Sequence, residues 1–188
     1  MGQRSFGSIN YNAGKVLCFL LIFLTINCRT QRLQVEHRYV YRGQGLRQFP
    51  DSIVKKADAT IVSFAPSWAM VDVYGGYDVP DSNNIAIIPD DIDRLKHLRV
   101  LNLAFNDVQT LPSSFHKLDR LEELDLSFNE KLNVWQAMQE IRQLKSLKKL
   151  NLYGILAAVR DSTRIRAECG KRVAVIVTKH DYNAMIVK

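Results

Sequence analysis

Large apolar residues recur at fixed spacings through the middle of the chain. Between residues 98 and 118 they follow the order Leu-x-x-Leu-x-Leu-x-x-Asn-x-Val-x-x-Leu-Pro-x-x-Phe-x-x-Leu. The first half of this order begins again at Leu121, 23 residues later, and at Leu147, 26 residues after that. A spacing of two places side chains on one face of a strand, so these leucines predict short strands with a buried face. The chain is therefore expected to consist of stacked repeats.

An asparagine follows the strand half of each complete repeat. Asn106 and Asn129 stand where the chain must turn, and a side-chain amide there can bond backbone groups that the turn leaves unpaired. Shifted back by 23 residues, Asn83, Ile85, Ile88-Pro89, Ile92 and Leu95 keep the same register, and Leu46-x-x-Phe49-Pro50-x-x-Ile53 repeats the second half once more. The strand half before Asn83 looks missing, because its places hold Gly75, Gly76, Asp78 and Pro80.

The segments between the strands predict short helical returns. Residues 89–95 and 112–118 begin with proline, which the first turn of a helix tolerates. Residues 134–144 carry apolar side chains at a helical spacing, so an α-helix is expected there, with Trp135 and Met138 used for packing. An amphipathic helix would also suit residues 140–149 alone, but the interposed Asn and Leu-Pro exclude one for residues 98–132.

This combination of residues resembles the leucine-rich repeat family. The resemblance implies an α/β fold: a short solenoid with parallel strands on the concave face and helices or turns on the convex face. It also implies a non-catalytic module that binds a protein or peptide partner.

A short solenoid must cover its two open ends. Alternating residues from Leu33 to Tyr41 predict a strand that caps the first end. At the other end we expect a helix over 155–169, stopped by Gly170, and a closing strand over 173–177, with Cys169 buried as a small apolar residue. Residues 65–82 interrupt the periodicity between a strand expected at Ile61–Phe64 and the turn at Asn83. They contain Trp68, Tyr74 and Tyr77; we interpret them as a degenerate repeat, and a binding loop is the alternative.

The beginning of the chain predicts export. Arg4 and Lys15 precede an apolar run over residues 16–26, which at about 1.5 Å per residue is too short to span a core of about 30 Å. This length suits a signal peptide. The run ends just before Cys28 and resembles a bacterial lipoprotein signal, which implies an acylated cysteine, although Thr25 and Asn27 depart from the usual residues. Ordinary cleavage near Cys28 and a retained signal-anchor remain open.

Residues that point outward from the predicted strands are candidates for binding. They form three columns across the sheet, and the middle column of short polar side chains suits hydrogen bonds to a partner. The first unit contributes Val100, Asn102 and Ala104. The predicted partner-binding residues are Asn102, Glu123, Asp125, Ser127, Lys149, Asn151 and Tyr153.

Composition and charge narrow the function classes. The chain has 188 residues, 47% of them hydrophobic and 24% charged, which suits one modest globular domain. Its formal charge is +7, but arginines near an acylated Cys28 would lie beside an anionic membrane, so we expect no nucleic-acid partner. The four histidines have no metal-ligand spacing, and no nucleophile is paired with a base, so no metal, cofactor or enzyme activity is expected. If the protein were an enzyme, its hydrolytic residues would have to lie in the insertion, around Asp72, Tyr74 and Asp78.

These interpretations divide the chain into five parts. They are a signal peptide (1–27), a basic segment and cap (28–64), an insertion or degenerate repeat (65–82), the repeats (83–154) and a helix-strand cap (155–188). The predicted protein is a lipoprotein of a bacterial envelope that binds its partner on the concave face. A secreted soluble binder and a structural envelope component without a discrete ligand are the alternatives.

Overall fold

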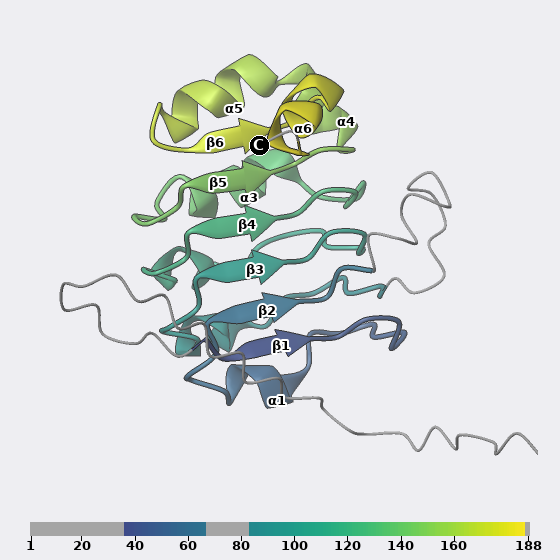
Figure 1. Cartoon of the computed structure of the whole chain (residues 1–188), viewed down its shortest axis with the longest axis vertical. Helices are drawn as coiled ribbons and strands as arrows, with labels where there is room; N and C mark the ends of the chain where they lie inside the picture. The colour runs from purple at the N-terminus through teal and green to yellow at the C-terminus, as the bar shows by residue number, and fades with distance from the viewer. Residues whose placement is uncertain (1–35, 67–82, 187–188) are drawn as a thin grey trace, which may run out of the picture.

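The computed structural model describes residues 36–66 and 83–186. Its strands stack like rungs, with α1 beneath the first strand and α5 and α6 at the other end (Figure 1). The strands are β1 (Arg38–Val40), β2 (Ile61–Ser63), β3 (Val100–Asn102), β4 (Glu123–Asp125), β5 (Lys149–Asn151) and β6 (Ala174–Ile176). The helices are α1 (Asp51–Val54), the 3₁₀ helices η1 (Asp90–Arg94) and η2 (Phe115–Lys117), α3 (Val134–Ile141), α4 (Leu156–Arg160), α5 (Ser162–Cys169) and α6 (Lys179–Ile186).

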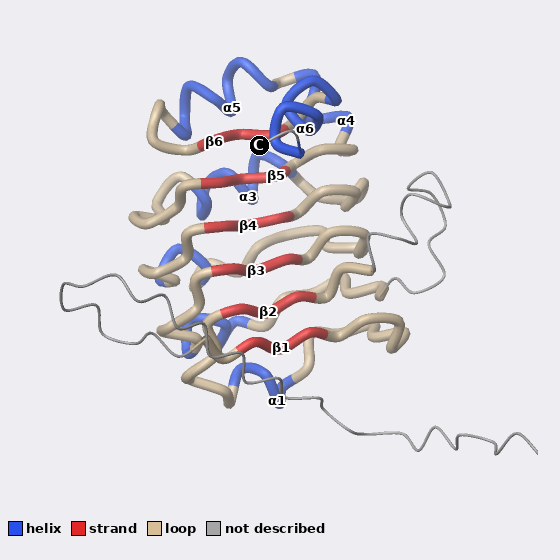
Figure 2. The backbone as a smooth tube through the Cα atoms, in the orientation of Figure 1, coloured by secondary structure: helices blue, strands red, loops and turns tan. Residues whose placement is uncertain are grey.

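Within the described residues, one six-stranded sheet runs in sequence order from β1 to β6, and every neighbouring pair is parallel. Helices and loops return the chain from the end of each strand to the start of the next (Figure 2). The middle residues of the strands are in register, so Val62, Leu101, Leu124 and Leu150 form one column. All four are at most 1% exposed. The predicted short α/β solenoid is confirmed.

The strand half that the sequence seemed to lack before Asn83 is β2. Val62 pairs with Leu101 in the sheet, and Phe64 is fully buried two residues further on. The side-chain amide of Asn83 donates to the carbonyl of Phe64 over 3.0 Å, which joins the strand to its turn. The leucine pattern was lost because the residues between 64 and 83 separate the two halves in the sequence. Most of that insertion, residues 67–82, lies outside the described residues.

The three return segments predicted over residues 89–144 differ in helix type. Residues 90–94 and 115–117 form 3₁₀ helices, which suit the short connections expected there. The longer third return forms α3, and the side chain of Asn133 accepts a hydrogen bond from the Gln136 amide at its first turn. Met138 is 1% exposed, as its packing role required.

The C-terminal cap is more divided than the sequence predicted. The helix expected over 155–169 is two helices, α4 and α5, which meet at Asp161, where φ is −100° and ψ is 16°. The carboxylate of Asp161 accepts a hydrogen bond from Trp135 Nε1 over 3.0 Å. The residue at the break therefore connects the C-terminal cap to α3. Gly170 ends α5 with a φ of 67°, and the predicted closing strand is β6. Helix α6 follows and was not predicted.

Candidate protein-interaction face

The outward side chains of the six strands form two columns on one face of the sheet, which we call the strand face. The register fixes both columns, because each outward residue pairs with the equivalent residue of the next strand. The first column is Arg38, Ile61, Val100, Glu123, Lys149 and Ala174, and the second is Val40, Ser63, Asn102, Asp125, Asn151 and Ile176. The first column is thus apolar over β2 and β3 and charged over β4 and β5, while the second column is polar over all four strands.

The polar side chains of the second column are partly used by the chain itself. The Oδ1 atom of Asn102 accepts a hydrogen bond from the amide of Ala104 over 3.0 Å. Asp125 and Asn151 accept in the same way from the amides two residues on, over 2.9 and 3.1 Å. Each side chain therefore closes an Asx turn as the chain leaves its strand. The other halves of Asp125 and Asn151 bond each other, since Asn151 Nδ2 donates to Asp125 Oδ2 over 3.0 Å.

These turns also explain where the structure differs from the predicted third column. Ala104 and Ser127 are each only 1% exposed, because the strands end two residues earlier and the turn bends the chain inward. Asn151 is also 1% exposed. Tyr153 is half-buried and has left the strand face for a row of aromatic rings described below. Ser127 and Asn151 therefore support Asp125 and do not face solvent.

Asp125 is held in one orientation. Its Oδ1 accepts from the hydroxyl of Ser127 over 2.6 Å, in addition to the Ser127 amide, and its Oδ2 accepts from Asn151 Nδ2 over 3.0 Å. Burial raises the pKa of the Asp125 carboxyl above its usual range, although these hydrogen bonds and nearby Lys149 act in the opposite direction. The result is a fixed carboxylate that has lost much of its hydration.

A hollow of about 210 Å³ lies over β3, β4 and β5. Val100 and Asn102 line it on one side, Glu123 and Asp125 in the middle, and Lys149 on the other side. The Nζ atom of Lys149 is 3.6 Å from Glu123 Oε2, and both side chains remain accessible. This hollow brings together four of the seven predicted binding residues, and the buried Asn151 also borders it.

A row of stacked aromatic rings runs along the C-terminal ends of the strands, and sequence reasoning missed it. Phe105 stacks on Phe128 at 4.1 Å between centroids, Phe128 meets Tyr153 edge-on at 5.3 Å, and Tyr153 stacks on Tyr182 of α6 at 5.0 Å. The available signal was a phenylalanine directly before Asn106 and Asn129. Both phenylalanines have a φ of 56°.

The third repeat replaces this phenylalanine with Gly154, which has a φ of 81°. A Cβ atom on Gly154 would lie 2.6 Å from Cδ1 of Phe128. Glycine is therefore required at this position for two reasons: its backbone is in the left-handed region, and the Phe128 ring occupies the space where a Cβ atom would lie.

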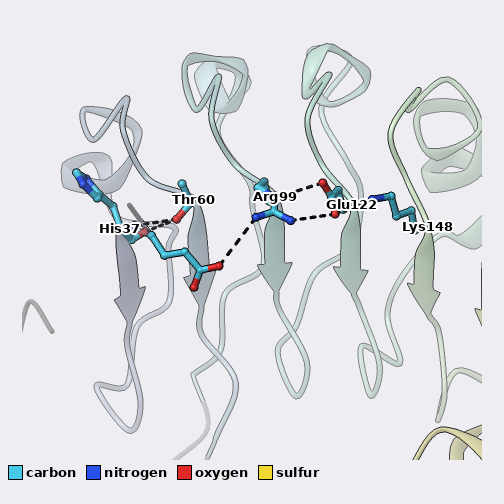
Figure 3. Close-up of polar contacts among 6 residues, drawn as sticks. His37, Thr60, Arg99, Glu122 and Lys148 are labelled. Atoms are coloured by element: carbon cyan, nitrogen blue, oxygen red, sulfur yellow. Dashed lines mark hydrogen bonds and ion pairs between the residues drawn. The ribbon is translucent and has the colours of Figure 1, made fainter. Parts of the chain in front are cut away.

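A chain of charged side chains crosses the repeats at the N-terminal ends of the strands (Figure 3). Arg99 lies 3.9 Å from Glu36 and donates two hydrogen bonds of 3.2 Å to Glu122, which also pairs with Lys148 at 3.0 Å. The hydrogen bonds from Arg99 and then Lys148 lower the pKa of Glu122. The Arg99–Glu122 and Glu122–Lys148 pairs join adjacent coils, and the Glu36–Arg99 contact reaches from the first coil to the third, all away from the hollow.

Cys28 and residues 67–82 lie outside the described residues. In the described part of the chain, no group of three or more His, Cys, Asp or Glu side chains could hold a metal ion. None of the helices in residues 36–66 and 83–186 is both long enough and apolar enough to cross a membrane. Cys169 is 4% exposed, as expected of a small buried residue.

Residues 81–130 match the family model described as leucine rich repeat. These residues are leucine-rich repeats. Together with the parallel sheet they make this part of the chain a leucine-rich repeat solenoid, an architecture typical of protein-interaction modules. No curated protein matches the sequence of the chain.

Among solved structures, the chain is similar to a leucine-rich repeat protein of Leptospira interrogans, with 25% identity, a TM-score of 0.42 and coverage of 65% of this chain and 33% of that one. It is also similar to a plant peptide hormone receptor, RGFR1, in complex with RGF2. There the identity is 21%, the TM-score 0.43, and the coverage 69% of this chain and 22% of the receptor. The chain thus spans about a third and about a fifth of these two proteins.

Proposed function

We propose that the chain is a non-catalytic interaction module that binds a protein or peptide partner on its strand face, the concave side of the solenoid. The observation that carries this proposal is the hollow over β3 to β5, where accessible charged side chains stand above a fully packed leucine core. Asn102, Glu123, Asp125 and Lys149 are the proposed contact residues. Ser127 and Asn151 hold Asp125 in place, and Tyr153 anchors the neighbouring aromatic row.

Photo-crosslinking in the producing cell tests this surface. A photoreactive phenylalanine analogue is placed at Val100, which lines the hollow, and in a matched protein at Asp90, an exposed residue of η1. We expect a defined adduct from position 100 that position 90 does not give. Equal adducts from both positions, or adducts from position 90 alone, would contradict binding on the strand face.

We further propose that Cys28 is acylated and tethers the module to a bacterial envelope membrane. The support is the apolar run over residues 16–26 that ends just before this cysteine. Labelled fatty acid should enter the intact chain in a bacterial host that processes lipoproteins, and label and membrane retention should vanish in Cys28→Ala. Unlabelled protein in the soluble exported fraction would instead identify a secreted binder.

A structural envelope component without a discrete ligand predicts other results. Deletion of the protein would then change envelope integrity, and no crosslinked partner would be recovered in a defined ratio.

A further inference from the structure

The hollow has features that select one kind of partner group. Glu123 and Asp125 are two residues apart on β4 and point to the same face, so their carboxylates stand side by side in the hollow. Lys149 is the one cationic side chain among the lining residues. With both carboxylates ionised, the lining has a net charge of −1.

The carboxylate of Asp125 is preorganised for binding a cation. Three hydrogen bonds from Ser127 and Asn151 fix its carboxylate, so a bound group meets it without further ordering. Burial has already removed part of its hydration, which reduces the desolvation cost of pairing with a cation. The Nζ of Lys149 is 3.6 Å from Glu123, and no hydrogen bond joins Lys149 to Asp125.

The charge of the C-terminal cap limits where a basic partner segment can lie. Residues 83–154, the repeats, contain ten Lys and Arg and ten Asp and Glu, a net charge of zero. Residues 155–186 contain six basic and three acidic residues, a net charge of +3. The cap therefore repels a basic segment, and the attraction comes from the carboxylates of the hollow.

We infer that the strand face binds a lysine or arginine side chain of an extended partner segment, with its cationic group between Glu123 and Asp125. Half-buried Val100 and Ile61 continue the face toward β1 as an apolar strip. Side chains at i and i+2 of an extended segment are about 6.6 Å apart, roughly one and a half strand spacings. The segment thus places an apolar side chain, two residues from the basic one, on this strip. This inference rests on the proposed function, because it names the chemistry of a partner on the same face.

Protein-observed NMR with n-butylguanidinium tests the inference on the full chain. Its neutral isostere n-butylurea and the anion butyrate serve as comparison ligands. We expect n-butylguanidinium to shift amide signals of β4, with neither comparison ligand doing so. Equal shifts from n-butylurea, or preferred binding of butyrate, would overturn the inference.

Variants with opposite expected effects separate binding from folding. Asp125→Asn keeps a residue type that closes the same turn at positions 102 and 151, although it loses the hydrogen bond from Asn151 Nδ2. We expect it to weaken n-butylguanidinium binding about tenfold, as loss of a charged hydrogen-bond partner does. Glu123→Gln should weaken it similarly, whereas Asp90→Asn should leave it unchanged. Lys149→Met removes the competing cation and should strengthen binding. Weaker binding in Lys149→Met would contradict the inference.

A peptide pair tests the apolar strip. Acetyl-Ser-Arg-Ser-Leu-Ser-amide should bind more tightly than the same peptide with serine in place of leucine, and equal affinity would overturn that part. Failure of every cationic probe, with the crosslink at position 100 retained, would reject the basic side chain while the proposed function stands. Loss of the crosslink itself would reject the proposed function.

Discussion

One asparagine per repeat joins the backbones of two coils. The Nδ2 atom of Asn129 donates to the carbonyls of Leu126 and Leu103, each over 2.9 Å, and its Oδ1 accepts from the Val108 amide over 2.9 Å. Leu103 and Val108 belong to the preceding coil. Because Asn129 is fully buried, water cannot replace these bonds if the side chain is removed.

Asn129→Ala is expected to destabilise the protein by about 3 kcal/mol, since it leaves several buried backbone groups unsatisfied at about 1–3 kcal/mol each. Asn102→Ala removes a single hydrogen bond at a half-exposed site and should cost about 1 kcal/mol. Urea unfolding of both variants measures the two costs. Equal losses would show that the buried network contributes no more than a surface turn.

Gly154→Ala is expected to cost more than the left-handed backbone conformation alone. A Cβ atom would overlap the Phe128 ring, so about 1–3 kcal/mol should be added to a conformational cost of about 1 kcal/mol. Gly170→Ala is the control, because Gly170 has a φ of 67° and no atom within 4 Å of the added Cβ. Thermal unfolding of the two variants compares them, and equal shifts in Tm would contradict the role of the ring.

At the residue scale, the sequence predicts where a residue lies in the repeat better than it predicts what its side chain contacts. The repeat register placed Asn106 and Asn129 at the turn and Glu123 and Lys149 on the strand face, because the strand period determines direction. It did not predict that Ser127 and Asn151 are buried. The burial of Ser127 depends on the inward bend after a three-residue strand, which leaves no periodic signal. Asn151 is the last residue of β5, and its side chain bonds to Asp125 on the neighbouring strand.

At the scale of elements, Arg166 of α5 holds the end of the sheet. Its guanidinium donates to the carbonyl of Val175 in β6 over 2.8 Å and to Asp181 of α6 over 2.7 Å. The Asp181 carboxylate also accepts from the amides of Val177 and Thr178. One ion pair thus connects two helices to the last strand.

This connection predicts a pH-dependent part of the stability. Burial alone would raise the pKa of Asp181, but its hydrogen bonds with Thr178, Val177 and Arg166 lower it to about 2. The unfolded value is about 3.9, so the contribution is fully present above about pH 4 and is lost as the pH falls toward 2.

Asp181→Asn should therefore be less stable than the wild type at neutral pH, by about 2 kcal/mol for the lost charged hydrogen bonds. The difference should shrink between pH 4 and pH 2, where the wild-type carboxyl becomes neutral. Denaturant unfolding across this range measures it, and a difference that stayed constant would exclude Asp181 as the titrating group.

The sequence predicted the elements within the repeats more accurately than the elements of the C-terminal cap. β3, β4 and β5 lie at the predicted leucine pairs, and η1 and η2 follow their prolines. In the cap, the apolar spacing suggested one helix, while a contact between Asp161 and Trp135 accompanies a break in the middle. That contact joins residues 26 positions apart, and a local pattern does not carry such information.

At the scale of the whole molecule, each strand pairs only with its neighbours in the sequence, and the Glu36–Arg99 ion pair is a side-chain contact that reaches from the first coil to the third. Stability is therefore transmitted mainly along one axis. The two ends are protected by different elements, α1 beneath β1 and α5 and α6 beyond β6 (Figure 1). Disturbance of one end should therefore spread from coil to coil and weaken with distance.

Ile165→Ala tests this, because Ile165 is fully buried in α5. The cavity should cost about 2–4 kcal/mol. Hydrogen exchange should rise first in β6 and β5 and least in β1 and β2. A uniform rise across all strands would mean that the solenoid opens as one cooperative unit.

The junction between the repeats and the cap also gives the protein an internal optical reporter. The guanidinium of Arg164 lies 3.8 Å from the centre of the Trp135 ring, and Trp135 Nε1 is bonded to Asp161. Undocking of the cap would remove a cation and a hydrogen bond from the indole and admit water to it. With Trp68 replaced by phenylalanine, tryptophan emission would then follow this single junction, and the detachment of the cap could be timed without an attached dye.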